Sequence, residues 1–374
     1  MGEPLIETPM EFRVATRKVC ATLIALALFA ASLSSTFTSE TAMAAGKQKM
    51  FDLSAHRGGR GLCPENTLAS FSNALAIGVT TLEMDAAVTK DGVVVISHDP
   101  FLDPNITRGL DEKWIGKERK LIKSLTFKEL RTYDVGRIKP GTGLAAQFPR
   151  QKPIEGTRIP SLASVLDLVK ASGNKDVFVS VELKYDPTDP SLPTPEREPY
   201  AKALIENLKT GGFLNRSTIQ SFDWDILQIV QRLAPEIPRV YLTSGYNEDD
   251  TLNVGKAEVS KWTGAINVNS YGGSVVRAIK AAGGTLWSPD ARGLTAAQIK
   301  EAHEAGISVI VWTVNDKEEM AKFIDMEVDG IITDYPDILR AVLIAKGKAV
   351  ANPSLRTSGG VMCRVRNFFS RNRG

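Results

Sequence analysis

No segment of this 374-residue chain approaches the ~20 consecutive apolar residues that a membrane-spanning helix requires. The sequence also lacks an excess of charge, because 46 lysines and arginines against 43 acidic residues leave a formal net charge of only +3. We therefore expect neither a stable membrane span nor a nucleic-acid partner. Histidine is scarce too, but two of the 3 histidines lie within residues 56–99. This segment is therefore the first candidate for a catalytic site.

The N-terminus has the features of a signal peptide. Basic residues between positions 13 and 18 precede an apolar run over 19–31, and small residues at 42–44 provide a cleavage site. We predict that residues 1–44 are a signal peptide and that the protein is periplasmic or secreted. An uncleaved N-terminal anchor is the alternative, whereas Cys20, at the start of the apolar run, argues against a lipoprotein.

The chain beyond the signal peptide contains Cys63 and Cys363, which an oxidising compartment would allow to pair. Cys363 belongs to a segment over 349–374 that is rich in serine, glycine and arginine. We expect this basic tail to be disordered and solvated, and the alternative is a contact with anionic lipid headgroups.

A short apolar run over 51–55 predicts a buried strand that ends at the His-Arg-Gly motif of residues 56–58. His56 is therefore expected at the C-terminal end of that strand. After Pro-Glu-Asn-Thr at 64–67, the apolar residues of 68–77 follow helical spacing. Gly78 is the expected C-cap of this helix.

Residues 81–88 have the pattern of a second strand. Glu83 and Asp85 lie two positions apart in it and therefore project from the same face. Two carboxylates aimed at one point repel each other unless a proton or a cation lies between them, and a divalent ion with oxygen ligands is the usual solution. A turn at 90–92 then predicts a hairpin that returns His98 to the side of His56.

Two further polar residues follow a strand predicted for 176–181. Glu182 and Lys184 again share one face of the strand. Glu182 offers a third carboxylate to a divalent cation, and Lys184 offers a positive charge to a substrate phosphate.

The motifs His-Arg-Gly, Pro-Glu-Asn-Thr, Glu-x-Asp, Asp-Gly, His-Asp and Glu-x-Lys occur in an order that resembles the glycerophosphodiester phosphodiesterase family. The resemblance extends from Leu53 to Leu343 and includes Val-Trp-Thr-Val-Asn at 311–315. It implies an enzyme that hydrolyses a small-molecule glycerophosphodiester to sn-glycerol 3-phosphate and an alcohol, with Ca2+ or Mg2+ as cofactor.

The resemblance and the side-chain chemistry together suggest a role for each candidate residue. The candidates are His56 and His98 as acid and base, Glu83, Asp85 and Glu182 as metal ligands, Arg57, Lys184 and Trp312 as substrate-binding groups, and Glu65 and Asn66 as supports that orient the others. The sequence leaves open which histidine is the acid, which ion is native, and whether water or a glycerol hydroxyl attacks. His303 lies in a helical pattern without a motif, so we expect an exposed helical residue there.

Strand signals recur along the rest of the chain, at 217–223, 239–243, 284–288, 307–313 and 329–334. With the strands above they give about eight strand-helix units, which predicts an α/β protein with a (β/α)8 TIM-type barrel over 45–348. Residues 265–269 could add a ninth strand. Residues 101–159 depart from this rhythm, and we expect an insertion there, after the second strand unit, that contains a helix near 127–133 and caps the substrate mouth. Trp287 and Trp312 either line that mouth or pack in the core.

Two other functions fit the same motifs. A phospholipase D-type enzyme acting on lysophospholipid or sphingomyelin would need an apolar groove beside the site, and the insertion shows little contiguous apolar sequence. A non-catalytic glycerophosphodiester-binding protein would lack a catalytic histidine or a metal carboxylate, and all of them are present. The alcohol and the oligomeric state stay open.

Overall fold

The computed structural model describes residues 50–189, 195–245 and 247–354. The predicted signal peptide, Cys363 and the arginine-rich end of the tail lie outside the described residues. The fold belongs to the compact unit that begins at Phe51. Within the described residues no helix is both long enough and apolar enough to cross a membrane.

Eight parallel strands of the described residues form a closed barrel, as predicted. Their order around the barrel is β1, β9, β8, β7, β6, β5, β4 and β2, and β1 pairs with β2 to close the ring. A further strand, β3, pairs with β2 in the antiparallel direction. The strands are β1 (Asp52–Ala55), β2 (Thr81–Val88), β3 (Val94–Ile96), β4 (Phe178–Leu183), β5 (Ser217–Ser221), β6 (Arg239–Thr243), β7 (Leu286–Pro289), β8 (Ser308–Val311) and β9 (Gly330–Thr333).

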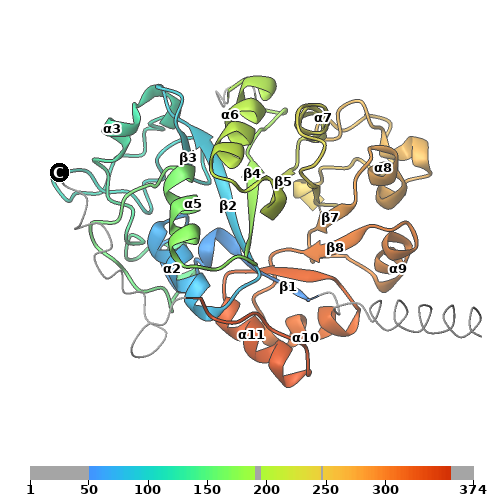
Figure 1. Ribbon diagram of the computed structural model, residues 1–374. Coiled ribbons are helices and arrows are strands. Elements are labelled where there is room, and N and C mark those ends of the chain that lie inside the picture. Colours follow the sequence, from blue (N-terminus) through green and yellow to red (C-terminus); the bar gives the residue numbers. More distant parts are fainter. Residues whose placement is uncertain (1–49, 190–194, 246, 355–374) are drawn as a thin grey trace, which may run out of the picture. The chain divides into compact units, whose positions relative to one another are not determined.

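Helices surround the barrel strands, as Figure 1 shows. Among the described residues, every α-helix outside the insertion contributes buried apolar side chains to the large core cluster. The helices are α2 (Leu68–Ile77), α5 (Leu162–Ala171), α6 (Arg197–Thr210), α7 (Trp224–Leu233), α8 (Val275–Ala281), α9 (Ala296–Glu304), α10 (Lys317–Asp325) and α11 (Pro336–Ala345), with the shorter α3 (Phe127–Leu130) and α4 (Gly143–Gln147) in the insertion.

Local sequence explains the helix that follows the first motif. The Thr67 side chain accepts a hydrogen bond from the Ser70 backbone, and the Ser70 hydroxyl accepts one from the Thr67 backbone. This reciprocal cap satisfies two backbone donors at the start of α2. Gly78 ends the helix in the left-handed conformation, at φ 85°. The predicted bounds of 68–77 are confirmed.

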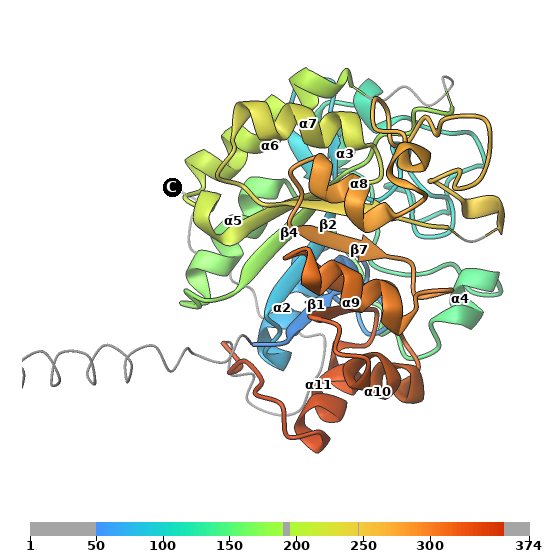
Figure 2. The same cartoon turned by 90° about the vertical axis from the view of Figure 1, so that its right-hand side faces the viewer.

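The segment from 101 to 159 contributes no barrel strand, and it has a small core of its own. Its apolar residues pack on β2 and β3 in a second cluster of buried side chains: Ala87, Val95, Leu102, Ile122, Leu125, Leu130, Val135 and Ile159. Figure 2 shows α4 at the same end of the barrel as the long loop between β6 and α8. The helix expected near 127–133 is the four-residue α3.

The prediction of a ninth strand at residues 265–269 is wrong. A 3-10 helix, η5 (Val268–Tyr271), occupies this region, and the Asn267 side chain accepts a hydrogen bond from the backbone of Asn269. Asparagine side chains that bond to nearby backbone favour such turns over strand pairing. The apolar pattern of the segment therefore reflects packing of Val268 in the core.

Two glycines with the same backbone conformation test how tightly the first motif packs. Gly58 has φ 78° and Gly92 has φ 79°, but a Cβ on Gly58 would lie 2.4 Å from the Ser70 hydroxyl, whereas nothing lies within 4 Å at Gly92. Both alanine variants impose the cost of a positive φ, about 1 kcal/mol. Gly58→Ala adds a clash, so we expect it to lower the unfolding free energy by about 1–3 kcal/mol more than Gly92→Ala. Urea denaturation measures both, and equal losses would contradict this packing.

Candidate active site

Three carboxylates meet at the C-terminal end of the barrel strands. Glu83 and Asp85 project from one face of β2, and the register pairs Asp85 with Glu182 on β4. Oxygen atoms of the three groups lie within 4.8 Å of one another, and all three side chains are buried. The sequence-based placement of these residues at one point is confirmed.

The proximity of these groups changes their affinity for protons. Burial and the neighbouring Asp85 raise the pKa of Glu83 well above its ordinary value. Burial likewise raises the pKa of Glu182 to about 7, with Asp85 acting in the same direction and Lys184 against it. Burial opposes ionisation of Asp85 as well, but Lys184 and Arg57 together hold its pKa well below the usual range. Without an added cation, the raised pKa values therefore favour a protonated carboxyl group within the cluster.

Hydrogen-bond donors fix the directions of the carboxylates. The Arg57 backbone donates to Glu83 Oε2 at 2.7 Å, and Gln220 Nε2 donates to Glu83 Oε1 at 2.7 Å. Asn66 Nδ2 donates to Asp85 Oδ2 at 2.8 Å. Asn66 thus orients a candidate ligand, as expected. Gln220 was missed by sequence reasoning, although it lies on β5, beside Glu182 in the strand register.

The three buried carboxylates fit a hard divalent cation. Such ions take oxygen ligands, and carboxylates are their most common protein ligands. Lys184 Nζ lies 2.9 Å from Glu182 Oε2 and 3.3 Å from Asp85 Oδ1, so it already supplies positive charge on one side of the cluster.

Arg57 lies between the carboxylate cluster and Glu65. Its backbone has φ 52°, a left-handed conformation that L-residues seldom adopt. The guanidinium contacts Glu65 Oε1 at 2.9 Å and Asp85 Oδ2 at 3.4 Å. Glu65 also lies 3.8 Å from Arg60. Glu65 is therefore the support that holds Arg57, in agreement with the expectation.

His56 is held by a residue from the opposite end of the chain. Its Nδ1 donates to Asp334 Oδ1 at 2.6 Å, and Arg60 Nε donates to the same oxygen at 2.9 Å. Asn315 Nδ2 donates to Asp334 Oδ2 at 2.7 Å. The pair forms because β1 and β9 are neighbours in the closed barrel, with Ala55 opposite Thr333. Sequence reasoning gave Asp334 no role, although its place directly after the last strand was the available signal.

His98 has a carboxylate partner of its own. Its Nδ1 lies 2.9 Å from Asp99 Oδ1. Burial and the positive charges of Lys184 and Arg57 lower the pKa of His98 to about 4. Burial also lowers the pKa of His56, against the opposing effect of Asp334. Both imidazoles are therefore neutral near pH 7, and the carboxylate at Nδ1 leaves the Nε2 lone pair free in each.

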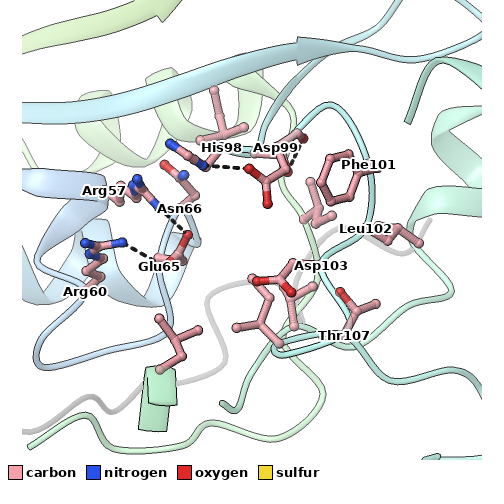
Figure 3. A pocket seen from close by; sticks show the side chains of 16 residues that line it. Arg57, Arg60, Glu65, Asn66, His98, Asp99, Phe101, Leu102, Asp103 and Thr107 are labelled. Carbon is pink, nitrogen blue, oxygen red and sulfur yellow. Dashed lines mark hydrogen bonds and ion pairs between the residues drawn. The ribbon is translucent and has the colours of Figure 1, made fainter. Parts of the chain in front are cut away.

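A cavity of about 220 Å³ opens between the barrel and the insertion (Figure 3). On one side Figure 3 shows Arg57, Arg60 and Glu65, and on the other Asp99, Phe101, Leu102, Asp103 and Thr107. Its lining residues are Arg57, Arg60, Glu65, Asn66, Ile96, Ser97, His98, Asp99, Phe101, Leu102, Asp103, Ile106, Thr107, Val135, Leu144 and Ile159. The insertion therefore forms one wall of a cavity that contains His98 and Arg57.

The two candidate tryptophans have different places. Trp287 is buried in the core and its Nε1 donates to Thr243 at 2.8 Å. Trp312 is half-buried, packs edge-to-face on Phe222 at 5.4 Å, and is not among the lining residues of the cavity. His303 is exposed on α9, as expected.

A model of the glycerophosphoryl diester phosphodiesterase family matches residues 56–338 of the chain. The chain belongs to this family. A glycerophosphodiester phosphodiesterase of Caldanaerobacter subterraneus subsp. tengcongensis is 30% identical over 293 residues, which cover 78% of this chain and 97% of the relative. The crystal structure of a family member from Silicibacter pomeroyi DSS-3 has a TM-score of 0.71 at 32% identity, over 82% of this chain and 97% of the other.

A more distant relative is the lysophospholipase D GDPD1 of Rattus norvegicus. It is 24% identical over 303 residues, which cover 77% of this chain and 85% of the relative. The protein is thus a phosphodiesterase of the glycerophosphodiester family, and the family includes enzymes described as acting on lysophospholipids.

The Asp334 carboxylate is predicted to fix the His56 ring in this phosphodiesterase. Asn315 Oδ1 accepts from the Asp334 backbone, so its Nδ2 must face Asp334 Oδ2. In Asp334→Asn, the new NH2 group replaces one of the two oxygens that accept these hydrogen bonds. In one orientation it would face Asn315 Nδ2, and in the other it would face His56 Nδ1 and Arg60 Nε, and all of these are donors. We expect a roughly 10- to 100-fold loss of kcat/KM and a further fall in the pKa of His56, because a negative charge is removed.

The chain has 3 histidines, so NMR titration of the ring resonances can follow each one. An unchanged His56 titration in the Asp334→Asn variant would contradict the role of this pair.

Proposed function

We propose that the protein hydrolyses glycerophosphodiesters to sn-glycerol 3-phosphate and an alcohol by two-histidine acid-base catalysis. The observation that carries this proposal is the convergence of three buried carboxylates, Arg57 and an aspartate-held imidazole at one barrel mouth. This combination provides groups for proton transfer and for charge stabilisation at a phosphate. The signal peptide predicted from the sequence supports a periplasmic or secreted location.

The cationic and the acidic residues of the site have different proposed roles. Arg57 and Lys184 lie beside the carboxylate cluster and offset negative charge that gathers on the phosphoryl oxygens. Glu83, Asp85 and Glu182 would hold Ca2+ or Mg2+. When bound, such an ion polarises a phosphoryl oxygen and lowers the pKa of a hydroxyl beside it.

His56 and His98 transfer the protons. One removes a proton from the attacking hydroxyl, and the other protonates the departing alkoxide. Asp334 and Asp99 accept from Nδ1 of the two rings, so each ring uses Nε2 for this exchange. Asp334 and Asp99 also stabilise the imidazolium that forms during the reaction.

Lysophospholipid is the competing substrate. The cavity has an apolar wall, which such a substrate would need, but its volume of about 220 Å³ is limited. The cavity lining also includes the charged side chains of Arg57, Arg60, Glu65, Asp99 and Asp103, so it favours small polar diesters.

The histidine pair can be tested against a matched third histidine. We expect His56→Ala and His98→Ala each to lower kcat for glycerophosphocholine about 10²- to 10⁴-fold, read as sn-glycerol 3-phosphate release by a coupled dehydrogenase. His303→Ala should have the wild-type rate, because His303 is exposed and bonds to Asp329 at 3.0 Å. Equal rates in all three variants would remove the proposal, provided that circular dichroism shows intact folding.

Metal removal tests the carboxylate cluster. We expect a chelator to abolish hydrolysis and Ca2+ or Mg2+ to restore it. Binding to the folded state alone should also stabilise the protein, by about 2.7 kcal/mol at a concentration 100 times Kd. Glu182→Gln should lose this rise in Tm, while Glu304→Gln, at an exposed position of α9, should keep it. A chelator-resistant enzyme without an ion-dependent Tm would contradict the metal site.

A further inference from the structure

The two sides of the insertion cavity differ in how their charges are balanced. On the barrel side, Arg57 and Arg60 are paired with Glu65, and Arg60 also with Asp334. On the insertion side, the described lining residues from 96 to 159 include two carboxylates but no lysine or arginine. The insertion side therefore carries an uncompensated negative charge.

Asp103 is the carboxylate that lacks a cation. Its Oδ1 accepts from the backbone and from the side chain of Asn105, at 2.8 and 3.0 Å. These bonds fix the side chain, and no ion pair joins it to any residue that the structure describes. Asp99 differs, because it accepts from His98. Burial raises the pKa of Asp103, and the nearby charges of Asp99 and Glu65 add to this effect.

Thr107 supplies a second and independent observation. It lines the same cavity and is only 1% exposed. Its hydroxyl has no hydrogen-bond partner among the described residues. A buried hydroxyl without a partner reduces stability, so a ligand that bonds to it recovers free energy. Figure 3 shows Thr107 and Asp103 on the same side of the cavity.

We propose that this cavity receives the alcohol released from the glycerophosphodiester, and that Asp103 and Thr107 select an alcohol with a primary ammonium group, of the ethanolamine type. This inference rests on the proposed function. An ammonium has three N–H donors, which can serve both the Asp103 carboxylate and the Thr107 hydroxyl. A quaternary ammonium keeps the attraction to Asp103 but cannot donate to Thr107. A neutral alcohol such as glycerol gains no charge attraction.

The position of the cavity agrees with this role. Arg57 and His98 lie at its barrel side, next to the carboxylate cluster, so an alcohol in the cavity would be attached to a phosphate near these groups. Phe101 and Leu102 line the same cavity as Asp103 and would give the ammonium apolar surroundings that exclude water. Exclusion of water strengthens an ion pair.

The test compares three diesters that release the same sn-glycerol 3-phosphate. For the wild-type enzyme with its metal, we expect kcat/KM to fall from glycerophosphoethanolamine to glycerophosphocholine to glycerophosphoglycerol. The first and last should differ about tenfold or more, the effect of one charged hydrogen bond. The common product gives all three reactions one readout.

Two variants separate the two contacts. Asp103→Asn retains the oxygen that accepts from Asn105, so the loop should stay folded. It should lower kcat/KM for both cationic substrates by more than it lowers kcat/KM for glycerophosphoglycerol. Thr107→Val should remove the advantage of ethanolamine over choline alone. Asp111→Asn, at an exposed position of the insertion, is the control and should keep all three values.

The outcomes distinguish this inference from the function on which it rests. Equal losses on all three diesters in Asp103→Asn, or no change on any, would overturn the ammonium site while hydrolysis itself stands. The ammonium site would also be overturned if the wild-type enzyme did not prefer the cationic substrates. Folded, metal-loaded wild-type protein that hydrolyses none of the three would instead refute the proposed function.

Discussion

Three carboxylates buried within 4.8 Å of one another repel, and the surrounding structure is arranged to hold them together. Parallel pairing of β2 with β4 forces Asp85 and Glu182 into neighbouring positions, so the fold itself creates the repulsion. Lys184 and Arg57 offset part of it, and pKa values raised by burial show that the offset is incomplete. An anionic phosphate would add to the repulsion. A divalent cation would satisfy both the carboxylates and the phosphate.

The two imidazoles are likewise held by carboxylates, which lie at Nδ1 of each ring. Asp334 holds His56 in this way, and closure of the barrel between β1 and β9 brings the two together. Arg60 links this pair to the insertion, because its guanidinium lies 4.6 Å from the Phe148 ring while its Nε bonds to Asp334. Arg60 therefore connects the insertion to the carboxylate that contacts His56.

The sequence predicts the features whose causes are local. The capped helix 68–77 follows from helical spacing, and the shared face of Glu83 and Asp85 follows from the two-residue period of a strand. The His56–Asp334 pair spans 278 positions and depends on which strands become neighbours, so no local pattern reveals it. Gln220 was missed for the same reason. A strand was wrongly predicted at 265–269 because an apolar pattern does not show that the Asn267 side chain will accept a hydrogen bond from the nearby Asn269 backbone.

The candidate catalytic groups and the proposed specificity residues belong to different parts of the fold. The candidate catalytic and metal-binding groups lie on strands of the sheet or in the segments that directly follow them, whereas one wall of the cavity comes from an insertion with a small core of its own. Asp103 and Thr107 lie in that wall: among the described residues, Asp103 accepts hydrogen bonds from Asn105 but has no ion pair, and the Thr107 hydroxyl has no hydrogen-bond partner. Unsatisfied buried groups reduce stability, and they persist where a ligand compensates them. The cost of these two groups therefore lies in the insertion and not in the barrel.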